Sequence, residues 1–447
     1  MSTPRLFGTN GIRGDAKKLF TNQFCFDITR AFLKFLGQKK IKPKVIVLAM
    51  DPRSSSDRIK KAVIAGIPRN WQVWDEGIIP TPALNYFTKQ KKAAGIMISG
   101  SHIEEKLNGI KFFVKNEEIT KKDEKIITRL YLQEKERIPY HKSRRLLKKS
   151  TQAKKMYVEM MIGLAKSNFG NFKVVVDPGN GSQTEAIPAA LKKLGVKVVE
   201  INADLKEKIL TRDTETEDTF PELKRRVVRE KANLGIGYDA DGDRAIFVDE
   251  KGAALKGEVS CSLVAKYSQE KVIVTPINTS AVVEHLGKKI IRTKVGVLYV
   301  VEMMKKHKTK VGFESNGGYI SGEIFYGRDG GTLTIKMLNL LQTTGKKLSK
   351  LTAELPTYHT IKTKTDCPRE INPLILAKAK ERYQQYKIED LDGLKIWFGQ
   401  DTWMLFRPSG NAPEFRIFAE AKKKETVVGL VSEGMKLVKT IIKKRSR

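Results

Sequence analysis

Cysteine and histidine are scarce in this sequence of 447 residues. There are three cysteines, Cys25, Cys261 and Cys367, and five histidines, all far apart. An odd and scattered set of cysteines argues against a disulfide framework. The same dispersion excludes a zinc site built from neighbouring Cys and His ligands.

Long apolar runs are also absent. No run reaches the roughly 18 apolar residues that a membrane-spanning helix needs, and the first residues, MSTPRLFGTNGIRG, contain no apolar stretch after a basic start. A signal peptide is therefore not indicated. We predict a cytoplasmic protein with no membrane partner.

Acidic residues are few compared with basic ones, and the formal net charge is +34. Such a charge is typical of nucleic-acid binding, but it also fits a lysine-rich, solvated surface. The lysines are spread along the whole chain and form no stripe with aromatic residues. The densest cluster, HKSRRLLKKS (141–150), is interpreted as a linker or a helix edge. We therefore expect no specific nucleic-acid partner, and nonspecific binding stays the alternative.

Three segments of the sequence resemble one another. They are KVIVLAMDPRSSS from Lys44, KVVVDPGNGSQ from Lys173 and KVIVTPINTSA from Lys271. Each is a short apolar, β-branched run that breaks at polar residues and is followed by a helical pattern. Apolar strands that feed helices are typical of covered, mostly parallel sheets. The repetition predicts three similar α/β domains.

The last part of the sequence has a different order. From about Thr360 it predicts a strand, a helix at 371–386, strands at 403–406 and 414–419, and a helix at 426–444. This order favours a separate α+β domain. The length agrees with three or four domains, and we place boundaries near Arg144, Lys251 and Thr357. The predicted domains are therefore 1–144, 145–251, 252–357 and 358–447.

Ser101 follows an apolar strand, AGIMI, in the segment ISGSHIEEKLNGIKFF (98–113). The small residues beside it are expected to expose its hydroxyl at a strand-to-loop turn. By itself the segment also fits an ordinary polar turn. It is not a G-x-S-x-G elbow, and no acidic residue suggests a hydrolase triad.

Three aspartates alternate in the loop GYDADGDRAIFVD (237–249). Asp239, Asp241 and Asp243 can converge on one hard cation because of their spacing. An EF-hand loop requires glycine at the sixth position, where this chain has Arg244. Three uncompensated carboxylates would repel one another, so a structural role is disfavoured. Mg²⁺ is the expected ion if phosphate is the partner.

Three further loops carry polar groups suited to a phosphorylated ligand. RPSGNAPEFR (407–416) offers a guanidinium, a hydroxyl and backbone N–H groups to a phosphate, although a plain hairpin turn fits equally well. GFESNGG (312–318), followed by RDGG at Arg328, places a glutamate among small residues. FGTNGIRG (7–14) is rich in glycine, carries Arg13 and lacks the P-loop pattern.

Together and in this order, these segments resemble the α-D-phosphohexomutase family, which includes phosphomannomutase/phosphoglucomutase and phosphoglucosamine mutase. FGTNGIRG is similar to the family's opening F-G-T-x-G-x-R-G, and ISGSHIEEKLNGIK to its phosphoserine loop. DADGDR matches its metal loop D-x-D-x-D-R. GFESNGG and RPSGNAP resemble its sugar and phosphate loops. IIPTPAL (78–84) and RTKVG (292–296) also match, so the resemblance covers nearly the whole chain.

The resemblance implies four domains around a central cleft, three of them mixed-sheet α/β units and the last α+β. It implies that phospho-Ser101 donates its phosphoryl group to a hexose phosphate, giving a hexose 1,6-bisphosphate that returns the other phosphate. Mg²⁺ would be held by Ser101, Asp239, Asp241 and Asp243. The further catalytic groups that it implies are His102, Lys111, Arg13 and Arg244. Substrate contacts are implied for Thr293, Gly296, Glu314, Asn316, Arg407, Ser409, Gly410, Asn411 and Arg416.

The chain departs from the family pattern at several positions. Ile103 and Glu104 replace the Asn-Pro pair after Ser-His, and Gly318 stands where many members carry a histidine. Asn411 and Ala412 replace Thr and Glu in the phosphate loop. These changes leave open a member that binds sugar phosphate or a protein partner without turnover. They also leave open the choice among glucose, mannose and glucosamine phosphates. A monomer or a homodimer is expected.

Overall fold

The computed structural model describes residues 6–41, 44–115, 117–143, 145, 147, 149–215, 219–410 and 412–445. The predicted domain boundary at Arg144 and the predicted substrate residue Asn411 lie outside these ranges. The chain forms two compact units. The first comprises Met1–Val264 and Asn316–Leu351, and the second comprises Ala265–Ser315 and Thr352–Arg447. The four predicted domain ranges stay a prediction.

The first unit begins with a mixed sheet of six strands in the order β1-β5-β4-β2-β3, with β6 paired to β5. β2 is parallel to β3 and β4, whereas β5 runs antiparallel to β4 and β1. The strands are β1 (Ile12–Asp15), β2 (Val45–Met50), β3 (Gln72–Ile78), β4 (Ala94–Ile98), β5 (Leu107–Val114) and β6 (Glu117–Glu118). Because β2 and β4 are buried on both faces, they read as continuous apolar runs.

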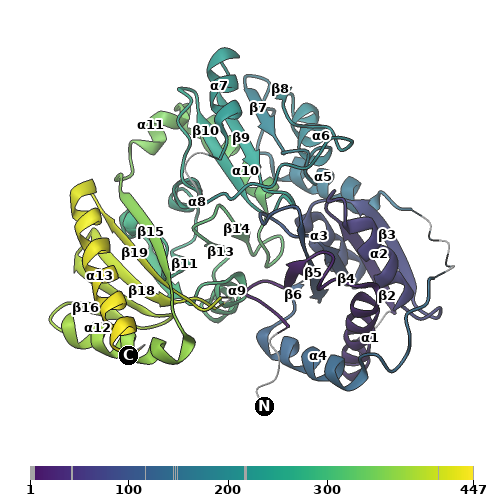
Figure 1. Ribbon diagram of the computed structural model, residues 1–447. Helices are drawn as coiled ribbons and strands as arrows, with labels where there is room; N and C mark the ends of the chain where they lie inside the picture. The colour runs from purple at the N-terminus through teal and green to yellow at the C-terminus, as the bar shows by residue number, and fades with distance from the viewer. Residues whose placement is uncertain are drawn as a thin grey trace. The chain divides into compact units, whose positions relative to one another are not determined.

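Four helices accompany this sheet: α1 (Asn22–Gln38), α2 (Ser56–Ala65), α3 (Thr81–Lys91) and α4 (Lys121–Glu134). α1 and α4 lie side by side (Figure 1). Local signals set their starts: the Thr21 hydroxyl accepts a hydrogen bond from the Phe24 N–H at 3.1 Å, and Thr120 with Asp123 forms a capping box. The core consists of the apolar residues of α1 and α2 packed against β2, β4 and β5.

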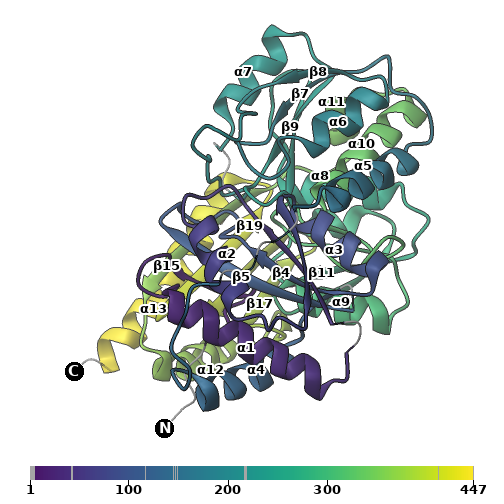
Figure 2. The ribbon, with the colours of Figure 1, turned by 90° about the vertical axis from the view of Figure 1, so that its right-hand side faces the viewer.

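A second sheet in the same unit has the order β10-β9-β7-β8. β9 and β8 are parallel to β7, and β10 returns antiparallel to β9. The strands are β7 (Lys173–Asp177), β8 (Lys197–Glu200), β9 (Leu234–Tyr238) and β10 (Ala245–Asp249). The remaining elements are α5 (Gln152–Leu164), α6 (Ala186–Lys193), α7 (Pro221–Arg229), α8 (Gly257–Lys266), β14 (Tyr319–Ser321), α10 (Gly330–Thr344) and α11 (Leu348–Thr352). α5 packs against α3, α6 and α10, and Figure 2 shows it beside α6 and α10.

The second unit contains a parallel group of strands in the order β12-β11-β13. Its elements are β11 (Val272–Pro276), the 3₁₀ helix η1 (Ala281–His285), β12 (Lys289–Thr293), α9 (Val297–Lys306) and β13 (Val311–Phe313). The three sequence repeats correspond to β2, β7 and β11. A helix follows each of these strands, as the pattern predicts. It is an α-helix after β2 and β7, but a 3₁₀ helix after β11.

The second unit also contains an antiparallel sheet in the order β15-β19-β18-β17-β16. Its elements are β15 (His359–Asp366), η2 (Arg369–Ile371), α12 (Asn372–Arg382), β16 (Lys387–Glu389), β17 (Leu394–Gly399), β18 (Thr402–Pro408), β19 (Glu414–Ala421) and α13 (Lys424–Arg445). α13 lies along β19 and β15 (Figure 1). The α+β prediction is confirmed, but the helix predicted to reach residue 386 ends at Arg382. Sequence analysis also missed β16 and β17, which form a hairpin.

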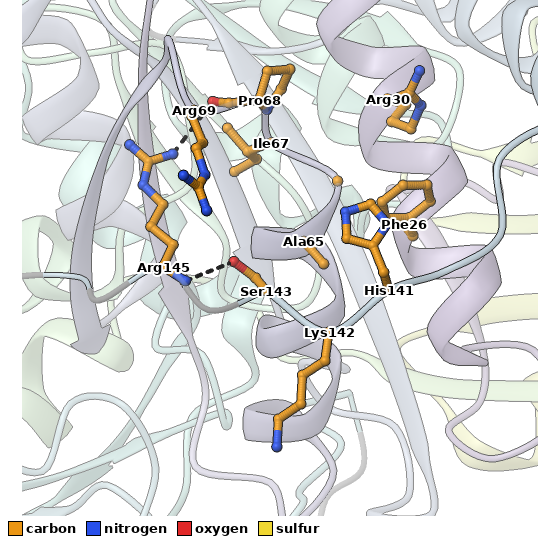
Figure 3. Close-up of a pocket in the computed structure, with 11 residues that line it drawn as sticks. Phe26, Arg30, Ala65, Ile67, Pro68, Arg69, His141, Lys142, Ser143 and Arg145 are labelled. Carbon is orange, nitrogen blue, oxygen red and sulfur yellow. Dashed lines mark hydrogen bonds between the residues drawn. The ribbon is translucent and has the colours of Figure 1, made fainter.

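A pocket of about 410 Å³ lies between α1, the end of α2 and the basic segment that connects α4 to α5. Arg145 donates hydrogen bonds to the Pro68 carbonyl at 3.4 Å and to the Trp71 carbonyl. Figure 3 shows the contact between Arg145 and Pro68. It also shows Lys142 and Arg30 pointing in opposite directions. The described part of the cluster 141–150 is therefore a connecting segment held against the first sheet's domain. No described helix is both long and apolar enough to cross a membrane.

Candidate active site

Ser101 lies at the turn that follows β4. Its backbone adopts the left-handed conformation (φ 53°), and its N–H donates to the Ser99 hydroxyl at 2.8 Å. The Ser101 hydroxyl donates to Asp239 Oδ2 at 2.7 Å and is fully buried. The expectation of an exposed hydroxyl is therefore wrong. A loop from the second sheet covers the hydroxyl and accepts its hydrogen bond.

That covering loop is the hairpin between β9 and β10. Asp239, Asp241 and Asp243 are buried, and one carboxylate oxygen of each lies within 4.8 Å of the others. Gly242 supports the turn with φ 68°, and a β-carbon there would approach the Gln183 side chain to 2.4 Å. The alternating aspartates thus converge on one point, as their spacing predicts.

Both oxygens of Asp239 accept hydrogen bonds from the protein, whereas Asp241 and Asp243 have one such oxygen each. Asp239 Oδ1 accepts from the Arg244 N–H at 3.2 Å, and Asp241 Oδ2 accepts from Lys111 Nζ at 2.7 Å. Asp243 Oδ2 also receives Lys111, at 3.4 Å. In contrast, Asp241 Oδ1 and Asp243 Oδ1 are buried without a hydrogen-bond partner in the described structure. Unpaired, buried carboxylate oxygens of this kind fit a hard divalent cation such as Mg²⁺.

The charges around the three aspartates shift their proton affinities. Burial raises the pKa of Asp239, and the neighbouring Asp241 and Asp243 raise it further. Burial opposes ionisation of Asp241 too, but Lys111 outweighs it and lowers the pKa of that carboxyl well below its usual range. Burial acts to lower the pKa of Lys111, yet the pull of Asp241 and Asp243 raises it overall. The site therefore holds Lys111 as a cation and favours a further positive charge among the carboxylates.

Arg13, Arg244 and His102 complete the predicted catalytic group in the first unit. Arg244 Nε lies 3.7 Å from Asp239 Oδ2 and 3.7 Å from Asp243 Oδ1. Arg13 enters on β1, and burial followed by the nearby Arg244 lowers its pKa to about 10. The His102 Nδ1 lies 3.5 Å from the Ser101 hydroxyl, and Arg244 together with burial lowers the pKa of His102.

Two residues at this site carry no role in the sequence analysis. The Thr81 hydroxyl donates to Asp241 Oδ2 at 2.6 Å, and the Thr81 N–H donates to the Asp241 carbonyl at 2.9 Å. Arg328 Nη2 donates to Asp243 Oδ2 at 2.6 Å. The segments IIPTPAL and RDGG contain these residues, but a sequence does not show which carboxylate a side chain will reach.

Asp392, for which the sequence predicted no role, contacts two loops of the second unit that carry predicted substrate residues. Asp392 Oδ2 accepts from Arg407 Nε at 3.0 Å and from Arg407 Nη2 at 2.9 Å. The same oxygen accepts from the Val295 N–H at 3.0 Å, beside Gly296, which precedes α9 with φ 133°. Asp392 therefore brings the loop 292–296 and the loop that begins at Arg407 together. The Asp392-Gly393 pair signals a turn in the sequence, but not this contact.

The rest of the loop after Arg407 is held by bonds within the same hairpin. The Ser409 N–H donates to the Glu414 carbonyl at 2.9 Å, and the Arg416 guanidinium donates to Glu414 Oε1 at 2.6 Å. Gly410 lies between these contacts in the turn. Ser409 is buried although it belongs to a loop, so the hairpin bonds fix its position.

The predicted sugar loop is divided between the two units. Glu314 is buried and belongs to the second unit, as does Thr293, whose hydroxyl donates to the Lys294 carbonyl at 2.7 Å. Asn316 belongs to the first unit, where its carbonyl accepts from the Thr214 hydroxyl at 2.8 Å and its Oδ1 accepts from the Gly318 N–H at 3.0 Å. The predicted catalytic residues therefore form one group around Ser101, and Arg407 with the loop that contains Gly296 forms a second group at Asp392.

Three family models match most of the chain. They describe domains I, II and III of phosphoglucomutase/phosphomannomutase, each an alpha/beta/alpha domain, and match residues 4–138, 155–252 and 256–358. The chain is 34% identical to a phosphoglucomutase/phosphomannomutase of Thermococcus kodakarensis, over 98% of this chain and 99% of that protein. It is 33% identical to a probable phosphoglucosamine mutase of Pyrococcus abyssi, over 99% of both chains.

Solved structures share the fold. A putative phosphomannomutase of Thermus thermophilus superposes with a TM-score of 0.81 at 22% identity, covering 98% of this chain and all (100%) of that chain. An Aspergillus fumigatus N-acetylphosphoglucosamine mutase, in complex with GlcNAc-6P and magnesium, superposes with a TM-score of 0.61 at 14% identity, covering 99% of this chain and 97% of that chain.

Proposed function

This chain belongs to the phosphoglucomutase/phosphomannomutase family of α-D-phosphohexomutases, and on that premise we propose that it interconverts hexose 1-phosphates and hexose 6-phosphates through a phosphoserine at Ser101. The enzyme is thus an intramolecular phosphotransferase of the isomerase class. Its substrate is a phosphate of glucose, mannose or glucosamine. The phosphoglucosamine mutase and phosphoglucomutase/phosphomannomutase names of its relatives support this range.

One observation carries the proposal: buried charged atoms of both signs, each without a hydrogen-bond partner in the described structure, lie in the aspartate and arginine cluster that the Ser101 hydroxyl contacts. Arg13 Nε, Arg13 Nη2 and Arg244 Nε are buried donors without a hydrogen-bond partner in the described structure. Asp241 Oδ1 and Asp243 Oδ1 are buried acceptors that also lack a hydrogen-bond partner in the described structure. Leaving buried charged groups unpaired costs free energy. A phosphoryl group satisfies the donors and a divalent cation satisfies the acceptors.

The proposed reaction consists of two phosphoryl transfers, and each transfer moves a different phosphoryl group. The bond between phosphorus and Ser101 Oγ breaks as a sugar hydroxyl oxygen bonds to phosphorus, and the hydroxyl proton passes to an enzyme base. The released Ser101 Oγ takes up a proton. The resulting hexose 1,6-bisphosphate then presents its other phosphoryl group to Ser101 Oγ, which loses that proton as the new bond forms, while the released sugar oxygen takes up a proton. Lys111 and Arg13 offset the charge of the transferring group, and His102 is placed to exchange protons beside Ser101.

The metal loop would hold Mg²⁺ through Asp239, Asp241 and Asp243, with the Ser101 oxygen or its phosphoryl group beside them. When bound, Mg²⁺ supplies Lewis-acid stabilisation of the phosphoryl oxygens. The magnesium complex of the Aspergillus fumigatus enzyme supports this ion. The chain's own residues prepare the site by hydrogen bonds: Thr81 and Lys111 donate to Asp241, Lys111 also donates to Asp243, and the Arg244 N–H donates to Asp239.

The second group of residues would bind the parts of the substrate that do not react. Arg407, Ser409 and Gly410 suit the distal phosphate because a guanidinium, a hydroxyl and backbone N–H groups all donate hydrogen bonds. Asn411 and Arg416 belong to the same proposed loop. Glu314, Asn316, Thr293 and Gly296 would contact the sugar, and binding energy from these contacts would orient the reacting end. A cytoplasmic monomer or homodimer without a nucleic-acid partner stays our prediction.

A substrate panel tests the proposal. The purified protein, with Mg²⁺ and glucose 1,6-bisphosphate, is assayed on the 1-phosphates of glucose, mannose and glucosamine, and the intact mass is measured for one phosphate on Ser101. We expect turnover on at least one sugar and a phosphate lost in Ser101→Ala. Binding of a sugar phosphate without turnover on any of the three would instead show the degenerate member of the family.

A further inference from the structure

The loop that carries Ser101 is folded around one buried guanidinium. Arg53, in the segment between β2 and α2, has a fully buried side chain. Its Nη2 donates to the Ser101 carbonyl at 2.5 Å and to the Ile103 carbonyl at 2.8 Å. Its Nη1 donates to the Glu104 carbonyl at 2.8 Å and to the Leu107 carbonyl at 3.2 Å. Four carbonyls of the loop therefore face a single cation.

Asp51 holds the guanidinium and the start of the same loop. Its Oδ2 accepts from Arg53 Nε at 3.0 Å, from the Ser99 hydroxyl at 2.8 Å and from the Gly100 N–H at 3.2 Å. Its Oδ1 accepts from the Ser56 hydroxyl at 3.0 Å. Because Ser99 in turn accepts from the Ser101 N–H, a continuous set of hydrogen bonds joins Arg53 to both sides of Ser101.

Gly100 brings the backbone into contact with the guanidinium. A β-carbon at Gly100 would lie 2.6 Å from Arg53 Cζ and 2.7 Å from Arg53 Nε. Those distances are shorter than real β-carbons show, and the guanidinium can move only by breaking some of the five hydrogen bonds that fix it. Glycine is therefore required here by the guanidinium and not by the backbone angle, since Gly100 has no positive φ.

The orientation of the four carbonyls has a consequence for the phosphoryl group. In a trans peptide the C=O and the next N–H point in opposite directions. With the Ser101 and Ile103 carbonyls turned to Arg53, the N–H groups of His102 and Glu104 point away from it. The loop thus presents N–H dipoles on the side opposite Arg53, and Ser101 is held left-handed at its start. Backbone N–H groups that share a side attract anions.

Resting on the proposed function, we propose that Arg53 is a positioning residue for phosphoryl transfer. It acts through the backbone: it holds Ser101 Oγ against the metal loop and turns the four carbonyl dipoles that it binds away from the phosphoryl group. It does not touch the substrate. Its loss is therefore expected to lower the rate at which Ser101 gains and loses its phosphate, with little effect on how tightly sugar phosphate binds.

Arg58 offers a matched control in the same domain. It lies on α2, and its guanidinium also donates to backbone carbonyls, to Phe20 at 2.8 Å and to Ala16 at 2.5 Å. It contacts no residue of the Ser101 loop among the described hydrogen bonds. Replacement of either arginine therefore removes hydrogen bonds from a guanidinium to backbone carbonyls, but only Arg53 makes these bonds to the loop that carries Ser101.

The test compares Arg53→Lys with Arg58→Lys in the full-length protein. Thermal unfolding, kcat, KM and the rate of Ser101 phosphorylation by glucose 1,6-bisphosphate, followed by intact mass, are measured for both. We expect Arg53→Lys to lower kcat and the phosphorylation rate at least 100-fold with KM within threefold. Arg58→Lys should keep kcat and the phosphorylation rate within threefold of the wild-type values, even if its Tm falls as much as that of Arg53→Lys. Equal rates in the two variants would overturn the inference.

Two further variants keep the test decisive if Arg53→Lys unfolds. Gly100→Ala retains Arg53 but forces the guanidinium from the loop, so it should reproduce the loss of kcat; a fully active Gly100→Ala protein would contradict the inference. Arg53→Ala should regain activity in millimolar guanidinium chloride, whereas Arg58→Ala should not respond. An inactive wild-type protein with no phosphate on Ser101 would instead refute the proposed function, and the inference with it.

Discussion

The group around Ser101 and the group around Asp392 are built in different ways. Around Ser101, side chains from the turn after β4, from β5 and from the β9–β10 hairpin bond directly to one another, and a few buried charged atoms have no hydrogen-bond partner in the described structure. Around Asp392, Arg407 already gives two of its donors to a carboxylate. The first arrangement suits bond making at fixed points. The second suits binding, in which a ligand's phosphate shares or replaces an existing partner.

The largest difference between the two groups is expected from a substitution at Ser101. Ser101→Ala removes the oxygen that accepts the phosphoryl group, so turnover is expected to fall by more than about 10³-fold, as for loss of other nucleophiles. The measurement is kcat with Mg²⁺ and the bisphosphate. Ser262→Ala is the control, because Ser262 is equally buried but lies on α8 without a hydrogen-bond partner in the described structure. A fully active Ser101→Ala protein would remove the phosphoserine mechanism.

The next largest effect is expected at the metal loop. Asp241→Asn removes the charge of a proposed ligand, so Mg²⁺ should bind at least about 100-fold more weakly by calorimetric titration. Asp177→Asn is the matched control: Asp177 is also buried and pairs with Arg212 Nη1 at 2.6 Å, but it is not one of the three clustered aspartates. Its loss should lower stability and leave Mg²⁺ affinity unchanged. Equal Mg²⁺ affinity in both variants would contradict the metal assignment.

Arg407→Met sharpens the contrast between chemistry and binding. Loss of a charged hydrogen bond to a phosphate costs about 1.5–3 kcal/mol, so KM is expected to rise roughly 10- to 100-fold. The value of kcat should change much less. Arg382→Met, at an arginine that pairs with Glu433 on the surface of the same sheet's domain, should leave both constants unchanged. If kcat falls and KM does not rise, Arg407 acts in the chemical step, and the two groups do not differ in the proposed way.

The smallest effect concerns pH and the stability of the second unit. Burial alone would raise the pKa of Asp401, but hydrogen bonds from neighbouring side chains lower it to about 2. The donors are Lys422, Tyr358 and His285. Because the pKa is lower in the folded state, the stabilisation is present above about pH 4 and is lost as the pH falls toward 2.

Asp401→Asn should therefore lower Tm by a few degrees, roughly, at pH 7, and the difference from wild type should shrink between pH 4 and pH 2. Scanning calorimetry at several pH values measures it. The value of kcat at pH 7 should be unchanged, because Asp401 belongs to neither group of proposed site residues. A constant difference in Tm down to pH 2 would contradict the assignment of this stabilisation to the Asp401 carboxylate.

Local patterns in the sequence predicted the elements well where burial and periodicity agree. The apolar runs that became β2, β7 and β11 are recognisable because both faces of these strands are covered. The helix predicted to reach residue 386 was too long because the next residues pair as β16 with β17, and that pairing depends on a partner strand. The α+β character of the last part of the chain was nevertheless predicted from the order of its elements.

The sequence by itself determined the fold class, the alternating aspartates and the candidate nucleophile, because each depends on residues close together in the chain. Only the tertiary structure decided that Ser101 is buried against Asp239, that Asp392 joins Arg407 to the loop at Val295, and that Arg53 holds the Ser101 loop. These contacts join residues 48 to 138 positions apart, or pair one carboxylate with two loops. The spacing of residues along the chain does not indicate such partners, because the packing of the sheets determines them.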